Sequence, residues 1–245
     1  MRPHFVAAGM VLWVIAAAAA RPAGSPAQRA APDVRADALL QKAIDASGGE
    51  AALTRARVLR WTADATVHAG ERQIHLSGRW EVEPPDRAVT ATWEKDKGEA
   101  STRRLIIDAS GGWMERNAQR TPMPPAMLAH ERDQFYLYSI MRLVPLRDPG
   151  VRLSVSPASS ATGPGLLVTR DGRPDVQVFF AANGRIARLR TRVTDPSSGR
   201  PVVEDLVTTG TIAANGVRWP RAIIITWDGK PYFDMVIKEL EVSGV

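Results

Sequence analysis

Apolar and polar residues alternate over long stretches of the chain after residue 57, which is the period-two pattern of half-buried β-strands. Two such runs, residues 59–67 and 74–82, flank a turn at Ala69-Gly70. They predict a long antiparallel hairpin with one apolar face. Shorter runs predict further strands over residues 87–93, 103–108, 113–114, 151–155 and 166–170.

The last third of the chain, residues 176–242, has the strongest hairpin signals. Asn183-Gly184, Asn215-Gly216 and Asp228-Gly229 are pairs that favour positive φ at both central residues of a type I′ turn, and apolar runs flank each pair. Residues 195–199 (Asp-Pro-Ser-Ser-Gly) supply a longer reversal. We therefore expect an unbroken ladder of antiparallel strands in one meandering sheet.

Two segments have a helical pattern instead. Asp33 is an expected N-cap for a helix that ends near Ser47, before Gly48-Gly49, and residues 50–55 add one more turn. A second helix is expected over residues 126–143, with residues 130–133, His130 among them, on its polar face. The segment before it, residues 121–125, holds three prolines and is excluded from a sheet interior.

This order of elements predicts a mainly β fold. We expect a large antiparallel curved sheet, a half-barrel or incomplete barrel of about 11–12 strands, with two α-helices covering the concave side. A sheet of this width must curl or split, because strands twist.

The N-terminus has the pattern of an export signal. Residues 6–20 form an uncharged run that suits a signal-peptide core, with cleavage expected after Ala20 or Ala27; an uncleaved membrane anchor is the alternative. The chain has no cysteine, which excludes a lipid-modified cysteine, disulfides and thiolate metal sites. We expect a signal peptide over residues 1–27 and a single domain over 28–245 with a flexible leader at 28–32, periplasmic or secreted and not a lipoprotein.

Charge adds little to this interpretation. The net charge of +6 falls to +4 once Arg2 and Arg21 leave with the signal peptide, and the remaining excess is scattered arginine. Such scatter, without a basic stripe, argues against nucleic acid as a partner. Arg188, Arg190 and Arg192 share one face of a strand, which indicates a solvated outer face or, alternatively, contact with anionic lipid headgroups or an acidic partner.

Catalytic patterns are weak. The four histidines (His4, His68, His75 and His130) show no zinc-ligand spacing, and the chain has no Gly-x-Ser-x-Gly, phosphate-loop or dinucleotide-binding pattern. The aspartates at 171, 195, 205 and 228 lie in or near expected turns, where local hydrogen bonding explains them. We predict no catalytic residue, no metal and no cofactor.

Two stretches resemble a known group of proteins. Residues 38–49, a helix with a Gly-Gly end, and the close formed by residues 215–220, 228–229 and 237–242 are similar to the periplasmic lipoprotein-sorting and lipid-carrier families. These are the LolA/LolB-like carrier and receptor and the lipid-carrying lipoproteins of mycobacteria. The resemblance covers essentially the whole mature chain and implies a hydrophobic cavity between sheet and helices that takes acyl chains. The absence of an N-terminal cysteine resembles the soluble carrier, although no residue clearly matches the arginine that latches the carrier's lid.

The chain supplies apolar residues for such a cavity, and a filled core is the alternative for the same residues. Met123, Met127 and Met141, near the second helix, suit either a re-packing lid or ordinary packing. The candidate ligand-binding residues are Trp61, Trp80, Trp93, Phe135, Met141, Ile223, Ile225, Trp227, Phe233, Met235 and Ile237.

The sequence thus favours a non-enzymatic carrier or binding protein that shelters lipid or lipoprotein acyl chains. It would act as a monomer, with an envelope or membrane protein as a further partner. One alternative is a docking or scaffold protein of the same fold with a filled core. The other is a hydrolase whose active residues have no recognisable pattern.

Overall fold

The structure is a computed structural model that describes residues 33–84, 87–156 and 164–244. All of them belong to one unit, residues 32–245, and the expected signal peptide and leader lie outside the described residues. The helices are α1 (Val34–Ala46), α2 (Glu50–Arg55) and α3 (Pro125–Met141), with 3₁₀ turns η1 (Glu99–Ser101) and η2 (Val144–Arg147). The strands are β1 (Val58–Ala69), β2 (Arg72–Glu83), β3 (Arg87–Glu94), β4 (Arg103–Asp108), β5 (Gly111–Arg116), β6 (Gln119–Pro122), β7 (Val151–Val155), β8 (Gly165–Arg170), β9 (Val176–Phe180), β10 (Ile186–Thr194), β11 (Pro201–Thr209), β12 (Ile212–Ala214), β13 (Val217–Trp219), β14 (Ala222–Trp227) and β15 (Lys230–Ser243).

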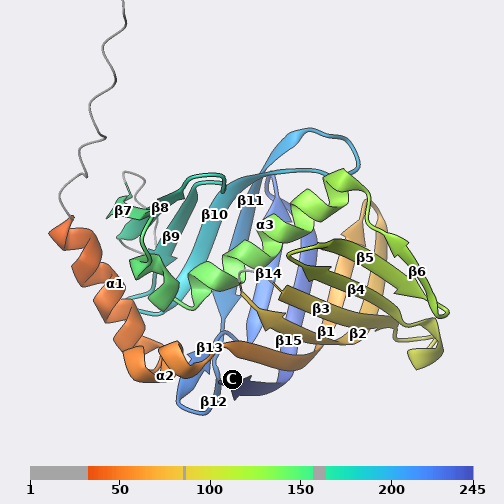
Figure 1. Ribbon diagram of the computed structural model, residues 1–245, viewed down its shortest axis with the longest axis horizontal. Coiled ribbons are helices and arrows are strands. Elements are labelled where there is room, and N and C mark those ends of the chain that lie inside the picture. Colours follow the sequence, from red (N-terminus) through yellow and green to blue (C-terminus); the bar gives the residue numbers. More distant parts are fainter. Residues whose placement is uncertain (1–32, 85–86, 157–163, 245) are drawn as a thin grey trace, which may run out of the picture. The chain divides into compact units, whose positions relative to one another are not determined.

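Thirteen of these strands form one antiparallel sheet in the order β6-β5-β4-β3-β2-β1-β15-β14-β11-β10-β9-β8-β7. The sheet is open, since β6 and β7 are its two edges. Figure 1 shows α3 crossing one face of this sheet, which we call the concave face, while α1 lies at the β7–β8 end. The mainly β fold with a large open antiparallel sheet and helices is therefore confirmed, with more strands than expected. One unexpected strand is β6, where Pro122 is tolerated because it ends an edge strand.

The expected unbroken C-terminal ladder is interrupted. β11 pairs directly with β14, Leu206 lying opposite Ile225, and the segment between them forms a separate two-stranded sheet, β12–β13. This hairpin packs against the end of α1: a Cβ at Gly48 would lie 2.1 Å from the carbonyl oxygen of Gly216, so only glycine fits there. The backbone N–H of Arg218 donates to Ser47 O at 2.9 Å and fixes the contact.

The predicted turns are partly confirmed. Both residues of Asn215-Gly216 and of Asp228-Gly229 have positive φ, as a type I′ turn requires. The prediction for Asn183-Gly184 is wrong, because only Gly184 has positive φ. A longer loop forms there instead, in which Ala181 N donates to Arg185 O at 2.8 Å.

The helices lie close to their expected positions. Asp33 caps α1 by accepting from Arg35 N at 3.0 Å and Ala36 N at 3.3 Å, and α1 buries Leu40 and Ile44 in the core. The expectation that His130 lies on the polar face of α3 is wrong, since its side chain is only 5% exposed. Helix α3 is not amphipathic in the simple sense: every residue from 135 to 141 is buried, whereas most of residues 125–134 are not.

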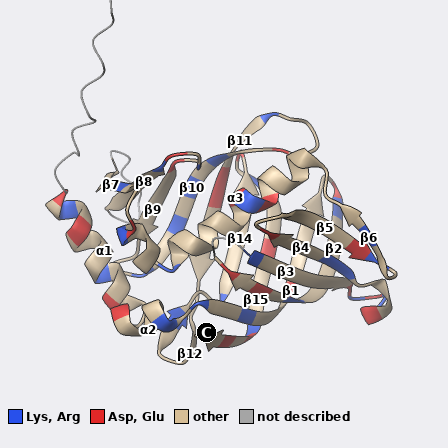
Figure 2. Cartoon of the chain, in the orientation of Figure 1, with Lys and Arg blue, Asp and Glu red and all other residues tan. Residues whose placement is uncertain are grey.

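Charged side chains are interspersed over the sheet rather than gathered in blocks. Figure 2 shows the basic residues of β10 beside the acidic residues of β11. Asp205 accepts from Arg188 at 2.6 Å and from Arg190 at 2.8 Å, while Arg192 is exposed. Burial alone would raise the pKa of Asp205, but the arginine contacts together outweigh burial and hold this pKa below its usual range.

Two negative observations apply to the described part of the chain. It contains no helix with the length and apolar character needed to span a membrane. It also contains no group of three or more His, Asp or Glu side chains placed to hold a metal ion.

Candidate functional site

The concave face of the sheet brings most of the predicted cavity residues together. Neighbouring strands place Ile223 opposite Met235, Ile225 opposite Phe233, and Trp61 opposite Trp80. We call the residues on this face Trp61, Trp80, Ile223, Ile225, Trp227, Phe233, Met235 and Ile237 the apolar wall. All of them except Trp227 and Phe233, which are partly buried, are less than 9% exposed.

Aromatic and sulfur contacts join the wall to α3. Trp61 and Trp80 stack with ring centroids 6.3 Å apart, and the indole N–H of Trp61 donates to Met235 Sδ at 3.4 Å. Tyr138 of α3 packs edge-on against Trp61 at 5.4 Å and lies 6.0 Å from Phe135. Phe135 and Met141, the candidate residues on α3, are both buried. Helix α3 therefore forms a roof over the wall.

Trp93 does not join this group. It pairs with Ser77, whose hydroxyl donates to Asp64 at 2.7 Å on the opposite, outer face of the sheet. There the Arg79 guanidinium lies 5.0 Å from the Trp93 ring centroid. The alternation of β3 indicates the wrong face, because Val89 and Trp93 lie on the outer face of the sheet whereas Thr90 lies on the inner face.

A buried carboxylate lies under the N-terminal half of α3. Glu204 of β11 is 0% exposed, and both of its oxygens accept from Gln134 Nε2, at 3.0 and 2.8 Å. The Trp227 indole N–H donates to the same carboxylate at 2.8 Å. Burial raises the pKa of Glu204, against the lowering effect of these two donors. Sequence reasoning missed Glu204, although its position in phase with the inward residues Val202 and Leu206 was a usable signal.

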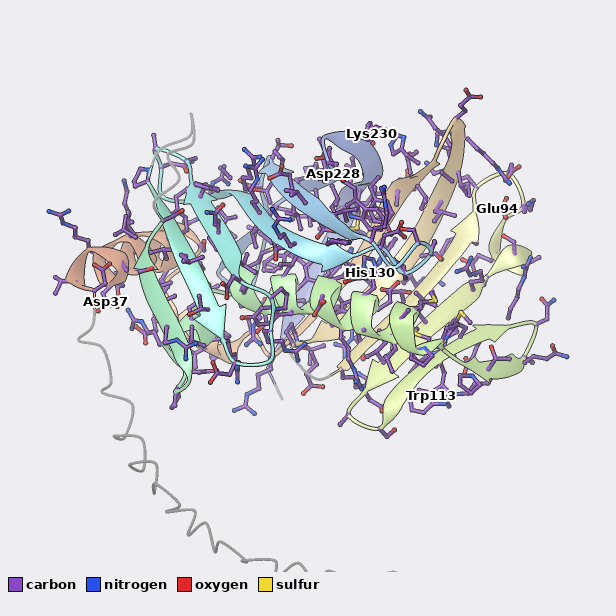
Figure 3. All side chains as sticks on the ribbon, turned by 90° about the horizontal axis from the view of Figure 1, so that it is seen from above. Asp37, Glu94, Trp113, His130, Asp228 and Lys230 are labelled. Carbon is purple, nitrogen blue, oxygen red and sulfur yellow. The ribbon has the colours of Figure 1, made fainter. Side chains whose placement is uncertain are left out.

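His130 lies next to this carboxylate group in an aromatic setting. Its ring meets Trp227 edge-on at 5.4 Å and Tyr232 at 6.4 Å, and Trp227 and Tyr232 stack at 3.6 Å. Figure 3 shows His130 in the interior, where α3 meets the hairpin that carries Asp228 and Lys230. Burial lowers the pKa of His130, and within the described residues its Nδ1 has no hydrogen-bond partner.

Further titratable groups are perturbed in the same region. Burial raises the pKa of Glu131 to about 7, with the charge of Arg103 opposing the shift. Burial, together with the charges of Glu131 and Glu204, also raises the pKa of Tyr138 and of Tyr232. The side chains of Gln134 and Trp227 both donate hydrogen bonds to the Glu204 carboxylate. Glu204 and Gln134 therefore form an internal polar contact between the sheet and α3.

A cleft of about 530 Å³ opens beside the N-terminal half of α3. It lies between the β4–β5 and β8–β9 turns, and its lining includes Asp108, Ala129, Arg132 and Arg173. Arg132 Nη2 donates to the Asp108 carbonyl at 3.1 Å and ties the helix to one rim. The volume falls within the range of small-molecule sites. The cleft thus marks a place where the edge of the roof meets solvent.

Comparison with known proteins identifies the fold. No protein-family model and no curated protein sequence matches the chain. Among solved structures, a LolA superfamily protein from Nitrosomonas europaea is similar with a TM-score of 0.56 at 10% identity, over 86% of this chain and 94% of that one. A domain named as an outer membrane lipoprotein-sorting protein, from Vibrio parahaemolyticus, has a TM-score of 0.52 at 8% identity over 85% and 92%. A DUF1329 family protein from Desulfovibrio piger has a TM-score of 0.55 at 8% identity over 84% and 92%. The chain has a LolA-like fold.

Proposed function

We propose that this protein is a non-enzymatic carrier that shelters the acyl chain of a lipid or lipoprotein between α3 and the apolar wall. The extent and burial of the apolar wall support the proposal. Six of its eight residues are buried, and they belong to one apolar cluster with buried residues of the roof helix, so lifting the helix would expose apolar surface. An acyl chain would then replace the helix, with a gain of about 0.8 kcal/mol for each CH₂ removed from water.

The contacts of α3 suggest which part of the roof opens. Residues 135–141 are buried on all sides, whereas the N-terminal half is joined to the sheet by the bonds from Gln134 to Glu204 and from Arg132 to Asp108. These are polar contacts that water can replace once the helix moves. Ala129 and Arg132, in the same half of the helix, line the cleft, so this half also borders solvent.

The proposal also includes a cellular location and an oligomeric state. Residues 1–27 would direct export, and one domain over residues 28–245 would act in the periplasm or outside the cell as a monomer. The lipoprotein-sorting role named for the Vibrio domain fits such a carrier.

The absence of cysteine allows a direct test. Ala109, in the β4–β5 turn, and Ala129, on α3, line the same cleft, and both are exposed. In an Ala109→Cys/Ala129→Cys variant, a short bifunctional maleimide should tie α3 to the rim and abolish uptake of a fluorescent fatty acid. Each single variant treated with the same reagent is the control and should keep uptake.

A docking protein of the same fold is the second candidate, and the near-complete burial of the wall favours it. Mass spectrometry of lipid extracted from the purified protein separates the two functions. An empty extract, together with no fatty-acid uptake by the untreated protein, would contradict the carrier and leave the docking protein.

A further inference from the structure

The polar group under α3 contains a carboxylate without a cationic partner. Glu204 is 0% exposed, and within the described residues it forms no ion pair. It accepts only from neutral side chains there, from Gln134 Nε2 at 3.0 and 2.8 Å and from the Trp227 indole at 2.8 Å. Buried carboxylates are usually paired with a cation, because removing their charge from water is costly. A cationic group at this position would therefore stabilise Glu204.

The charges near this carboxylate disfavour an anion. Burial raises the pKa of Glu204, and the charges of Asp133 and Asp205 raise it further. Burial likewise raises the pKa of Tyr232, and the charges of Glu131 and Glu204 add to that rise. The surroundings of Glu204 are thus acidic, which favours a positively charged group over a negatively charged one.

Opening of α3 would remove two of the three hydrogen bonds to Glu204. Gln134 belongs to the half of α3 that the proposed carrier lifts, whereas Trp227 belongs to the sheet. Water can hydrate Glu204 while the space under the helix is open, but a bound acyl chain would exclude that water. A ligand without a donor would then leave the carboxylate short of partners, and a site of this kind discriminates strongly against such a ligand.

Glu204 also adjoins the apolar wall directly. It lies opposite Trp227 in the β11–β14 register, and the next inward residue of β11, Leu206, lies opposite Ile225. Trp227 and Ile225 are both wall residues, and Trp227 donates to Glu204 itself. An amphiphile whose chain lies on the wall would therefore place its polar end beside Glu204.

His130 supplies a second polar atom from the helix side. It precedes Gln134 by one helical turn, so both side chains lie on the same face of α3. Its ring meets that of Trp227 edge-on at 5.4 Å, and its side chain is 5% exposed. Within the described residues its Nδ1 has no hydrogen-bond partner. A primary ammonium has three N–H donors, enough for both oxygens of Glu204 and for an imidazole nitrogen that accepts.

We propose that Glu204 recognises a hydrogen-bond-donating nitrogen group of the carried amphiphile, a primary ammonium above all, in place of the Gln134 carboxamide. This inference rests on the proposed carrier function. The carboxamide of Gln134 is then an internal substitute for the ligand, and it satisfies Glu204 while α3 is closed.

Three amphiphiles with the same dodecyl chain test this inference. They are measured by calorimetry below their aggregation concentrations, at a slightly alkaline pH where an alkylammonium keeps its charge. Dodecylammonium has the positive charge and the N–H donors, dodecyltrimethylammonium has the charge alone, and dodecanoate has neither. We expect dodecylammonium to bind at least about tenfold more tightly than the other two, because charge-assisted hydrogen bonds are the strong ones. The positive net charge of the chain would by itself favour dodecanoate.

Substitution of the carboxylate separates recognition by Glu204 from other causes. Glu204→Gln keeps the shape of the side chain and removes its charge, so it should weaken dodecylammonium binding about tenfold without weakening dodecanoate binding. If size alone excluded the trimethylammonium group, its disadvantage would persist in this variant. Glu71→Gln, in the exposed β1–β2 turn, is the matched control and should keep the wild-type order. In the wild type, the side-chain amide resonances of Gln134 should shift when dodecylammonium binds.

The outcomes distinguish this inference from the carrier function. Equal binding of the three amphiphiles, or an order that Glu204→Gln leaves unchanged, would keep the carrier and overturn recognition by Glu204. Binding of butylammonium as tight as that of dodecylammonium would also overturn the inference, because the chain would then contribute nothing. Binding of no amphiphile would contradict the carrier, and this inference with it.

Discussion

Residues 125–134 and residues 135–141 of α3 rest on the same sheet but are held by different interactions. The C-terminal half buries Leu137 and Ile140, each 1% exposed, against the core. The N-terminal half contributes His130 and Gln134 to a buried polar group around Glu204, and its other side lies along an open cleft.

The difference indicates where the helix can open. Apolar burial is lost in full when a side chain is exposed, whereas a polar contact is largely replaced by water. Segments that move are drawn from the less stable parts of a fold. We therefore regard residues 135–141 as the anchor of the roof and residues 125–134 as its movable part.

The largest expected effect is a difference in the free energy of unfolding between substitutions in the anchor and in the movable part of α3. Leu137→Ala should lower the free energy of unfolding by about 2–5 kcal/mol, because it leaves a cavity in a tightly packed region. Leu128→Ala, in the partly buried half, should cost less than half as much. Chemical denaturation followed by tryptophan fluorescence measures both. Equal losses would show that the two halves are equally anchored.

A smaller effect is expected from the polar contact itself. Gln134→Ala leaves Glu204 with Trp227 as its remaining side-chain donor and should cost about 1–3 kcal/mol. Hydrogen exchange should then rise over residues 125–134 and stay unchanged over 135–141. Gln73→Ala, at an exposed position of β2, is the control. If hydrogen exchange near α3 did not change, Gln134 would not be one of the contacts that hold residues 125–134 on the sheet.

The pH dependence of stability tests the burial of Glu131. Its pKa rises from 4.5 to about 7 on folding, so the folded state binds the proton more tightly than the unfolded chain. The contribution of Glu131 to stability is then fully present below pH 4.5 and falls as the pH rises through about 7. Because water reaches part of the side chain, we expect a change of about 1 kcal/mol rather than the full value of the shift.

The difference between the wild type and Glu131→Gln isolates this contribution, since all other titrating groups cancel. The wild type should lose stability relative to the variant between pH 4.5 and 7.5. Glu71→Gln, in the exposed β1–β2 turn, is the matched control substitution. A flat difference for Glu131→Gln would place its carboxyl in water.

The sheet was predictable because its information is local. Alternation over residues 59–67 and 74–82 set the β1–β2 register, and the Asn215-Gly216 and Asp228-Gly229 pairs set two turns. The departure of β12–β13 from the ladder was not predictable, because it depends on Gly48 fitting against Gly216 across the fold.

The site was predictable where alternation assigns the correct face. The wall residues of β14 and β15 share one face, as their period of two predicts, although Ile224 and Val236 on the other face are also apolar. Trp93 was misplaced because it shares the outer face of β3 with Val89, whereas Thr90 lies on the inner face. The burial of Glu204 and His130 was not predicted, because a charged or polar residue in a strand or helix is expected to be exposed unless its partners are known.

The smallest expected effect concerns the rim of the cleft. Arg132 Nη2 donates to the Asp108 carbonyl at 3.1 Å, and both residues line the cleft, where water can replace the bond. Arg132→Gln should therefore change the free energy of unfolding by only about 0.5 kcal/mol. Hydrogen exchange should nevertheless rise in the first turns of α3, because this bond ties that end to the β4–β5 turn. Arg192→Gln, at an exposed position of β10 outside the cleft lining, is the control, and it should leave exchange over residues 125–134 unchanged. If exchange in Arg132→Gln instead rose over residues 135–141 as well, α3 would open as one rigid unit, and the distinction between anchor and movable part would fail.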